Sequence, residues 1–239
     1  YESFNRSVGW LSDVNDRYGV EMVLENYSLG EDKGGRAEFK MIVEKDIIDA
    51  KHVNVNMGNL TVKGAAYINQ ASGFPLLRGK LSISHLDLVP FVGERMRHFP
   101  VARGNVEPVW SEKNVNFNYL KGYDVNVKLH VKSVTHTDFD IENFYVVLQS
   151  KDGVWQAKKA KGAIWEGNVT GDAVLDLTSV PIFSSSYTFQ DIRAEKLLDA
   201  VASHKTVFGT MSLAGTLGTN GMHPLSWVQN AKSNINYLV

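Results

Sequence analysis

Histidines and carboxylates are the side chains of this sequence that could bind a metal ion or transfer a proton. His130 and His136 are the closest histidine pair, but they lack an i, i+4 spacing and no carboxylate completes a familiar ligand set. Asp138 and Asp140 flank Phe139 on one expected strand, so both carboxylates point to the same side and could hold a cation. A solvated strand face explains this carboxylate pair better, and exposed strand or turn positions explain the histidines better.

Motifs for covalent or phosphate chemistry are absent from the sequence. No serine lies in a G-x-S-x-G elbow, and Gly167–Gly171 (GNVTG) lacks the Gly-Lys-Ser/Thr that a phosphate-binding loop needs. The chain has no cysteine, which excludes disulfides, thiolate metal sites and cysteine nucleophiles. We therefore expect a protein that is not an enzyme and that uses no metal or cofactor.

Composition narrows the class of protein further. The chain has 239 residues, of which 44% are hydrophobic and 21% are charged, so it can bury a core and is not disordered as a whole. Its 25 Lys and Arg residues nearly balance 26 Asp and Glu residues, which leaves a net charge of −1. That balance argues against a nucleic-acid binder and against a polybasic membrane-surface anchor.

The dominant pattern of the sequence is an alternation of apolar and polar residues. In Val125–Lys132 every odd position is aliphatic and every even position is polar, as in a strand with one buried and one wet face. Gly58-Asn59 separates two such runs and predicts a hairpin, and the other short polar links favour an antiparallel meander. Further strands are expected around residues 20–27, 37–43, 53–57, 60–63, 79–88, 144–149, 155–158, 162–165, 168–177, 185–189, 209–217 and 234–238.

Helical patterns are few. Apolar residues from Ala194 to Val201 recur at i, i+3, i+4 and i+7, which predicts a short helix near 194–203 with Asp191 upstream as its cap. Pro224–Val228 predicts a second short helix with proline in its first turn. The fold class is therefore mainly β with a minor α part: a long, twisted or curled antiparallel sheet, or an open groove-like β-sandwich, with one or two short helices.

The expected domains are a β lobe over residues 1–95, a connecting segment over 96–114 and a second β domain over 115–239. The connecting segment separates the lobes because its patterning is irregular and it contains Pro100 and Pro108. The chain begins at Tyr1 without a methionine, which we interpret as a fragment or a processed product. No run approaches the roughly 20 apolar residues of a membrane-spanning helix, so any export signal or anchor is expected outside this chain.

Several segments resemble signatures of the AsmA family. Ala163–Leu177 is similar to the family's G-x-v-x-G-x-a-x-l-D-l run, and Ala194–Ala200 resembles its short LLxAL helix. Phe208–Gly221 resembles the strand and turn that follow, and Gly79–Phe91 the hairpin strand that ends in LDLxPF. Val109–Ser111 stands in the place of the family's WS linker. The order and spacing of these segments extend the resemblance over residues 60–239.

The resemblance implies a periplasmic protein of the Gram-negative cell envelope, anchored in the inner membrane by a segment outside this chain. Larger members resemble bridge-like lipid-transfer proteins, in which a curled sheet with an apolar groove carries phospholipid towards the outer membrane and so supports its biogenesis. The expected ligand is then the acyl part of a phospholipid, with envelope proteins as further candidate partners and no nucleic acid.

In this interpretation the acyl chains lie on the apolar side of the strands. Each methylene removed from water contributes about 0.8 kcal/mol, so a groove needs no specific polar residue to hold a lipid. The candidate lipid-binding residues are Val125, Val127, Leu129, Val131, Val146, Leu148, Val169, Ala173 and Leu175.

Two alternatives remain open at this point. In the first, the same residues form the closed core of an ordinary β-sandwich. In the second, the chain is a non-catalytic structural module that assists outer-membrane protein assembly, with an exposed sheet edge that pairs with another chain.

Overall fold

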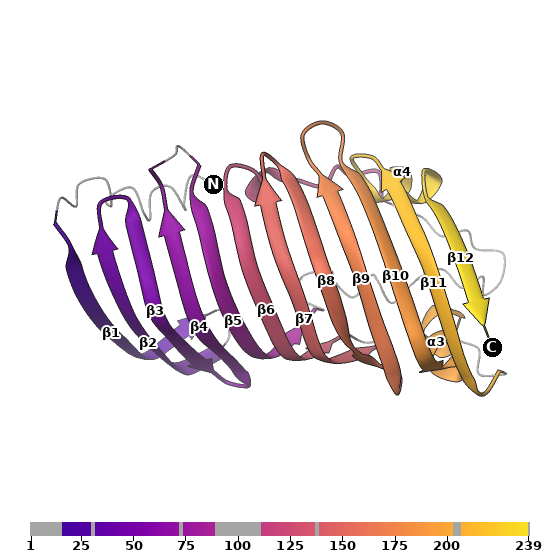
Figure 1. The fold of residues 1–239 in the computed structure, drawn as a ribbon, viewed down its shortest axis with the longest axis horizontal. Coiled ribbons are helices and arrows are strands. Elements are labelled where there is room, and N and C mark those ends of the chain that lie inside the picture. Colours follow the sequence, from indigo (N-terminus) through magenta and orange to yellow (C-terminus); the bar gives the residue numbers. More distant parts are fainter. Residues whose placement is uncertain are drawn as a thin grey trace.

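The computed structural model describes residues 16–29, 32–71, 74–88, 111–136, 139–202 and 207–238. In these residues twelve strands form one sheet whose spatial order is the order of the chain (Figure 1). The sheet is open: β1 forms one edge and β12 forms the other. The expected mainly-β, curled sheet is confirmed, and the described strands form a single sheet instead of the two packed sheets of a sandwich.

The strands bend along their length, and most are joined by tight turns (Figure 1). The Gly58-Asn59 hairpin is confirmed, because Met57 and Leu60 are direct partners across it. The strands are β1 (Tyr18–Leu29), β2 (Asp32–Glu44), β3 (Ile47–Met57), β4 (Leu60–Asn69), β5 (Leu76–Asp87), β6 (Asp124–Thr135), β7 (Asp140–Lys151), β8 (Val154–Ile164), β9 (Gly167–Asp176), β10 (Ile182–Arg193), β11 (Thr210–Asn220) and β12 (Lys232–Leu238).

The pairing of β5 with β6 departs from the expected meander. Every other neighbouring pair of the described strands is antiparallel, whereas β5 and β6 run parallel from Leu76 and Asp124 onwards. Parallel neighbours need a long crossover, and a short 3-10 helix, η3 (Asn118–Leu120), lies near its end. The parallel pair falls between the two predicted lobes, and their division into domains stays a prediction because one sheet includes strands of both.

β8 (Val154–Ile164) is one strand where the alternation predicts two, at 155–158 and 162–165. Lys159 has a φ of 56° and lies in a bulge of β8, where the register skips between Ala157 and Ala160. The Lys159 N–H donates a hydrogen bond to Oδ1 of Asp172, at 2.8 Å. The extra residue interrupts the two-residue period without ending the strand, so the sequence pattern breaks where the structure continues.

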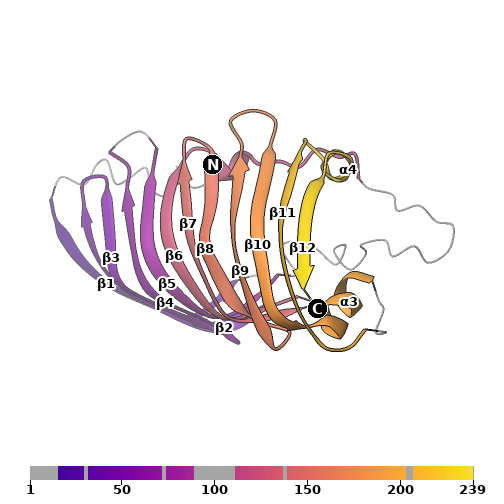
Figure 2. The ribbon, with the colours of Figure 1, turned by 45° about the vertical axis from the view of Figure 1, so that its right-hand side comes forward.

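Both predicted helices are present, and they lie at opposite ends of the last strands (Figure 2). α3 (Ala194–Ala202) follows β10 directly, and Ile192 and Ala194 are buried at the corner. Asp191, the predicted cap, is instead a bulge residue of β10 with a φ of 54°. α4 (Pro224–Gln229) begins with a proline and is capped by His223, whose Nδ1 accepts from the Ser226 N–H at 3.1 Å.

The turn after β9 depends on a single carboxylate. Oδ1 of Asp176 accepts hydrogen bonds from the Thr178 hydroxyl at 2.6 Å and from the Thr178 N–H at 2.9 Å. These bonds, the hydroxyl first, lower the pKa of Asp176 below its ordinary value of 3.8. A lowered folded-state pKa means stability that is present above the unfolded-state pKa and is lost as the pH falls through the folded-state pKa.

We therefore expect Asp176→Asn to reduce the dependence of the unfolding free energy on pH at acidic pH. The wild type should lose more stability than the variant as the pH falls below 3.8. Urea denaturation at a series of pH values measures both slopes. Asp140→Asn, an exposed carboxylate at the start of β7, serves as the control, and identical slopes for Asp176→Asn and the wild type would contradict the prediction.

Candidate functional site

One side of the sheet is apolar across its whole width. Residues that pair directly in neighbouring strands point to the same side, so the register assigns each residue to a side. Three rows of direct partners define what we call the apolar face. The first row, in strand order from β1 to β12, is Val20, Met41, Ala50, Ala66, Gly79, Val127, Leu148, Ala157, Ala173, Ser185, Leu217 and Ser233. The second row has two parts: from β1 to β7 it is Met22, Phe39, Val53, Gly64, Leu81, Leu129 and Val146, and from β8 to β12 it is Ala160, Gly171, Tyr187, Gly215 and Ile235. The third row, from β1 to β11, is Tyr18, Val43, Ile48, Ile68, Leu77, Val125, Ser150, Trp155, Leu175, Phe183 and Thr219.

The residues predicted to bind lipid all lie on this face. Val127 pairs with Leu148, and Leu129 pairs with Val146, so the β6 and β7 members are direct neighbours. The β9 members Val169, Ala173 and Leu175 are separated from them by β8, whose Ala157 pairs with Leu148 on one side and with Ala173 on the other. Val125 lies in the third row. Val131 and Val169 lie on the same side of β6 and β9, because each is four residues from Val127 or Ala173. The structure therefore brings the predicted set to one side of the sheet, although it does not test whether the set binds a ligand.

Burial is greatest at the centre of the apolar face. Val125, Val127, Val131 and Val146 expose 7%, 6%, 1% and 4% of their surface. The other predicted residues are half-buried, while at the edges Tyr18 and Ile235 expose 53% and 54%. A half-buried aliphatic surface between a packed centre and exposed edges can accept further apolar groups.

Small side chains leave a hollow in the apolar face over β8 and β9. Ala157, Ala160, Gly171 and Ala173 form its floor, and Phe144 and Tyr187 stand at its sides. Its volume is about 200 Å³, several times the roughly 30 Å³ that one water molecule occupies in the liquid. The lining is almost wholly apolar, so the hollow suits hydrocarbon better than any polar ligand.

Tyr187 sets one wall of this hollow. Gly171 and Gly215 are its direct partners on either side, and a Cβ added to Gly215 would lie 2.7 Å from the Tyr187 hydroxyl oxygen. The tyrosine ring therefore lies over Gly215. The neighbouring Phe189 packs edge-on against Tyr187 with ring centroids 5.9 Å apart. The sequence predicted Ala173 of this hollow but not Ala157, Ala160 or Gly171, since small residues give a weak hydrophobic signal. Only the register shows that these small residues lie side by side.

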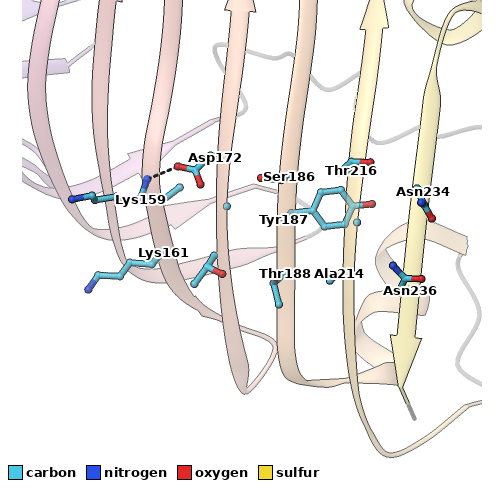
Figure 3. A pocket seen from close by; sticks show the side chains of 14 residues that line it. Lys159, Lys161, Asp172, Ser186, Tyr187, Thr188, Ala214, Thr216, Asn234 and Asn236 are labelled. Carbon is cyan, nitrogen blue, oxygen red and sulfur yellow. Dashed lines mark hydrogen bonds between the residues drawn. The ribbon is translucent and has the colours of Figure 1, made fainter.

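The opposite side of the sheet carries a second, polar hollow of about 530 Å³ over β8–β12 (Figure 3). Its polar side chains are hydroxyls and amides, together with Lys159, Lys161 and Asp172. All of these polar side chains are exposed except Tyr187, which is half-buried, and the one interaction drawn between them joins the Lys159 N–H to Asp172. A hollow without a buried polar group holds no side chain in a fixed catalytic geometry.

The histidines and carboxylates that were candidate metal ligands do not come together. His136 is buried, contrary to the expected exposure, and stacks on Phe139 with ring centroids 5.2 Å apart, whereas His130 is exposed. Asp138 lies outside the described residues. Within the part of the chain that the structure describes, no three histidine or carboxylate side chains are grouped as a metal ion would need.

Comparisons with known proteins identify the family. No helix among the described residues is long and apolar enough to cross a membrane. No curated protein and no solved structure matches the chain. The family model described as "AsmA family" matches residues 48–239, which run from β3 to the end of the chain and include the segments whose resemblance was noted. The chain belongs to the AsmA family.

Proposed function

We propose that this chain is a non-catalytic periplasmic domain that holds phospholipid acyl chains on the apolar face of its sheet. In the whole protein, which an additional segment anchors in the inner membrane, the domain contributes to phospholipid transport between the inner and outer membranes and to outer-membrane biogenesis. Family membership supports an envelope role, because the AsmA resemblance implies lipid traffic or assembly.

The observation that carries the proposal is the continuity of the apolar face. The row through Val127 crosses the sheet from Val20 to Ser233 with serine as its sole polar residue type. Alkyl chains gain about 0.8 kcal/mol for each buried methylene and need no directional contact, so a lipid can move along such a face without losing a specific partner. A conduit requires this combination of affinity and mobility.

Analysis of co-purified lipid tests the proposal. We expect the chain, purified without detergent from a Gram-negative host, to yield near-stoichiometric phospholipid when its organic extract is analysed by mass spectrometry. A soluble protein of similar size, purified in parallel, controls for carry-over. A stable, monomeric and lipid-free chain that also fails to take up phospholipid from vesicles would overturn the proposal.

The exposed edge at β12 favours a second candidate function, pairing with an envelope protein. Every residue of β12 is exposed, and Tyr237 and Leu238 expose 74% and 75% of their surface. Among the described strands β12 pairs with β11 alone, so its outer backbone groups are available to another strand. A lipid-free chain in the experiment above would direct attention to this structural role.

A further inference from the structure

The polar side of the sheet is divided into zones of different charge. On β1–β3 acidic and basic side chains form ion pairs: Arg36 with Glu25 at 2.8 Å, Lys40 with Glu21 at 3.1 Å. On β9–β12 the side chains around the polar hollow are mostly neutral hydroxyls and amides. The strands between these zones, β4–β8, lie at the centre of the sheet (Figure 1). Their polar side is basic.

The register places basic side chains of all these central strands except β7 close together on that side. Lys80 and Lys128 are direct partners across the parallel pair, and Val147 of β7 joins Lys128 to Lys158. Arg78 lies two residues before Lys80, and Lys63 and Lys161 belong to the adjacent row through Ser82, His130 and Tyr145. We call Lys63, Arg78, Lys80, Lys128, Lys158 and Lys161 the cationic face.

No ion pair among the described residues neutralises the positive charge of the cationic face. All of its members are exposed, and none forms an ion pair with another residue in the part of the chain that the structure describes. Lys158 Nζ donates to the Gln149 side-chain oxygen at 3.0 Å, and Lys161 Nζ lies 5.8 Å from the centre of the Tyr145 ring. Acidic residues of β4–β8 occur only at strand ends, as Asp87, Asp124, Asp140 and Glu142.

Like charges on directly paired residues destabilise a sheet, so Lys80 beside Lys128 calls for a compensating anion. We propose that the cationic face docks on the surface of a bilayer that contains anionic phospholipid, with the lysine ammonium groups among the lipid phosphates. This inference does not depend on whether the apolar face holds lipid. The near-zero net charge of the chain conceals the cationic face, because that total also counts acidic residues of other strands, such as Glu21, Glu25 and Glu38.

The make-up of the face favours a membrane surface over a nucleic acid. Its charges are spread over a broad sheet surface, and all but Arg78 are lysines, whose compact charge at the end of a flexible stem suits a mobile layer of phosphates. The aromatic residues among them are tyrosines, Tyr67 and Tyr145, a residue type enriched where protein meets the interface of a membrane. Binding should therefore follow the anionic lipid content and fall with salt.

Vesicle sedimentation with the full chain tests the proposal. The probes are vesicles of phosphatidylcholine alone and vesicles that also contain phosphatidylglycerol. We expect the wild type to sediment with the second kind at about 0.1 M salt and to be released at about 1 M, where the screening length falls from about 10 Å to about 3 Å. The triple variant Lys80→Gln, Lys128→Gln, Lys158→Gln should bind on the order of a hundredfold more weakly, roughly fivefold for each lysine.

A charge-matched triple variant provides the control. Lys45→Gln, Lys113→Gln and Lys196→Gln remove the same charge from exposed positions outside β4–β8, and this variant should bind as the wild type does within roughly threefold. Equal losses in the two triple variants would overturn the proposal, as would equal wild-type binding to both kinds of vesicle. Binding to a nucleic-acid duplex but not to phosphatidylglycerol vesicles would also overturn it. The salt and lipid dependence of the wild type decides the matter if a variant does not fold.

Discussion

Replacement of Gly64 by alanine is expected to lower the free energy of unfolding by about 3 to 5 kcal/mol, the range of the most damaging single substitutions. Gly64 lies in β4 with a φ of 153°, a conformation that residues with a Cβ rarely adopt. An added Cβ would overlap the carbonyl oxygen of Lys80 and lie 3.0 Å from the Cα of Leu81. Both atoms belong to the backbone of β5, so the clash can be relieved only if the two strands separate.

Chemical denaturation of the wild type and of the Gly64→Ala variant measures this change in the free energy of unfolding. Gly19→Ala is the matched control, because Gly19 also lies in a strand but has no atom within 4 Å of an added Cβ. That variant should stay within about 0.5 kcal/mol of the wild type. A Gly64→Ala protein with an unchanged unfolding midpoint and slope would mean that β4 and β5 do not approach as closely as described.

If the apolar face holds phospholipid as proposed, the substitution Ala173→Phe should remove most of the co-purified lipid. Ala173 lies on the floor of the apolar hollow, where a phenyl ring would take the space of several methylenes. Loss of three buried methylenes costs about 2.4 kcal/mol, which lowers affinity roughly fiftyfold. Mass spectrometry of the extracted protein, scaled to protein amount, gives the fraction of chains that carry phospholipid.

Val174→Phe is the control for that variant, because it adds the same ring one residue further along β9. Val174 pairs with Gln156 and Ser184, so its side chain points to the polar side of the sheet. The control should keep the lipid content of the wild type. If the folded Ala173→Phe protein retained as much lipid as the control, the acyl chains would have to lie elsewhere than in the hollow.

The strands could be predicted from the sequence because each exposes one side to water. Val125–Lys132 alternates without exception, and it lies entirely within β6. The helix near residue 194 could be predicted because its apolar stripe covers two turns. Likewise, the predicted lipid-binding residues within each strand share a side because they are an even number of residues apart. That the members of β6, β7 and β9 share the same side follows from the register.

What the sequence could not predict depends on pairing between strands. Nothing in β5 or β6 distinguishes a parallel neighbour from an antiparallel one, so the parallel pair was missed. The hollow depends on Ala173 lying beside Ala157 and Gly171 lying beside Ala160, which only the register of β8 with β9 determines. The cationic face arises in the same way, because Lys80 and Lys128 are far apart in the sequence and adjacent in the sheet.

The parallel pair of β5 and β6 also has a consequence for how the chain folds. Strands β1–β5 and β6–β12 are two meanders whose pairings join neighbours in the sequence, and such local contacts close small loops at low entropic cost. The contact of Leu76 with Asp124 instead joins two residues that are far apart in the sequence. Each meander can therefore form from its own hairpins. We expect the pairing of β5 with β6 to be the slow, final step of folding. During synthesis the first meander can be complete before β6 has emerged from the ribosome.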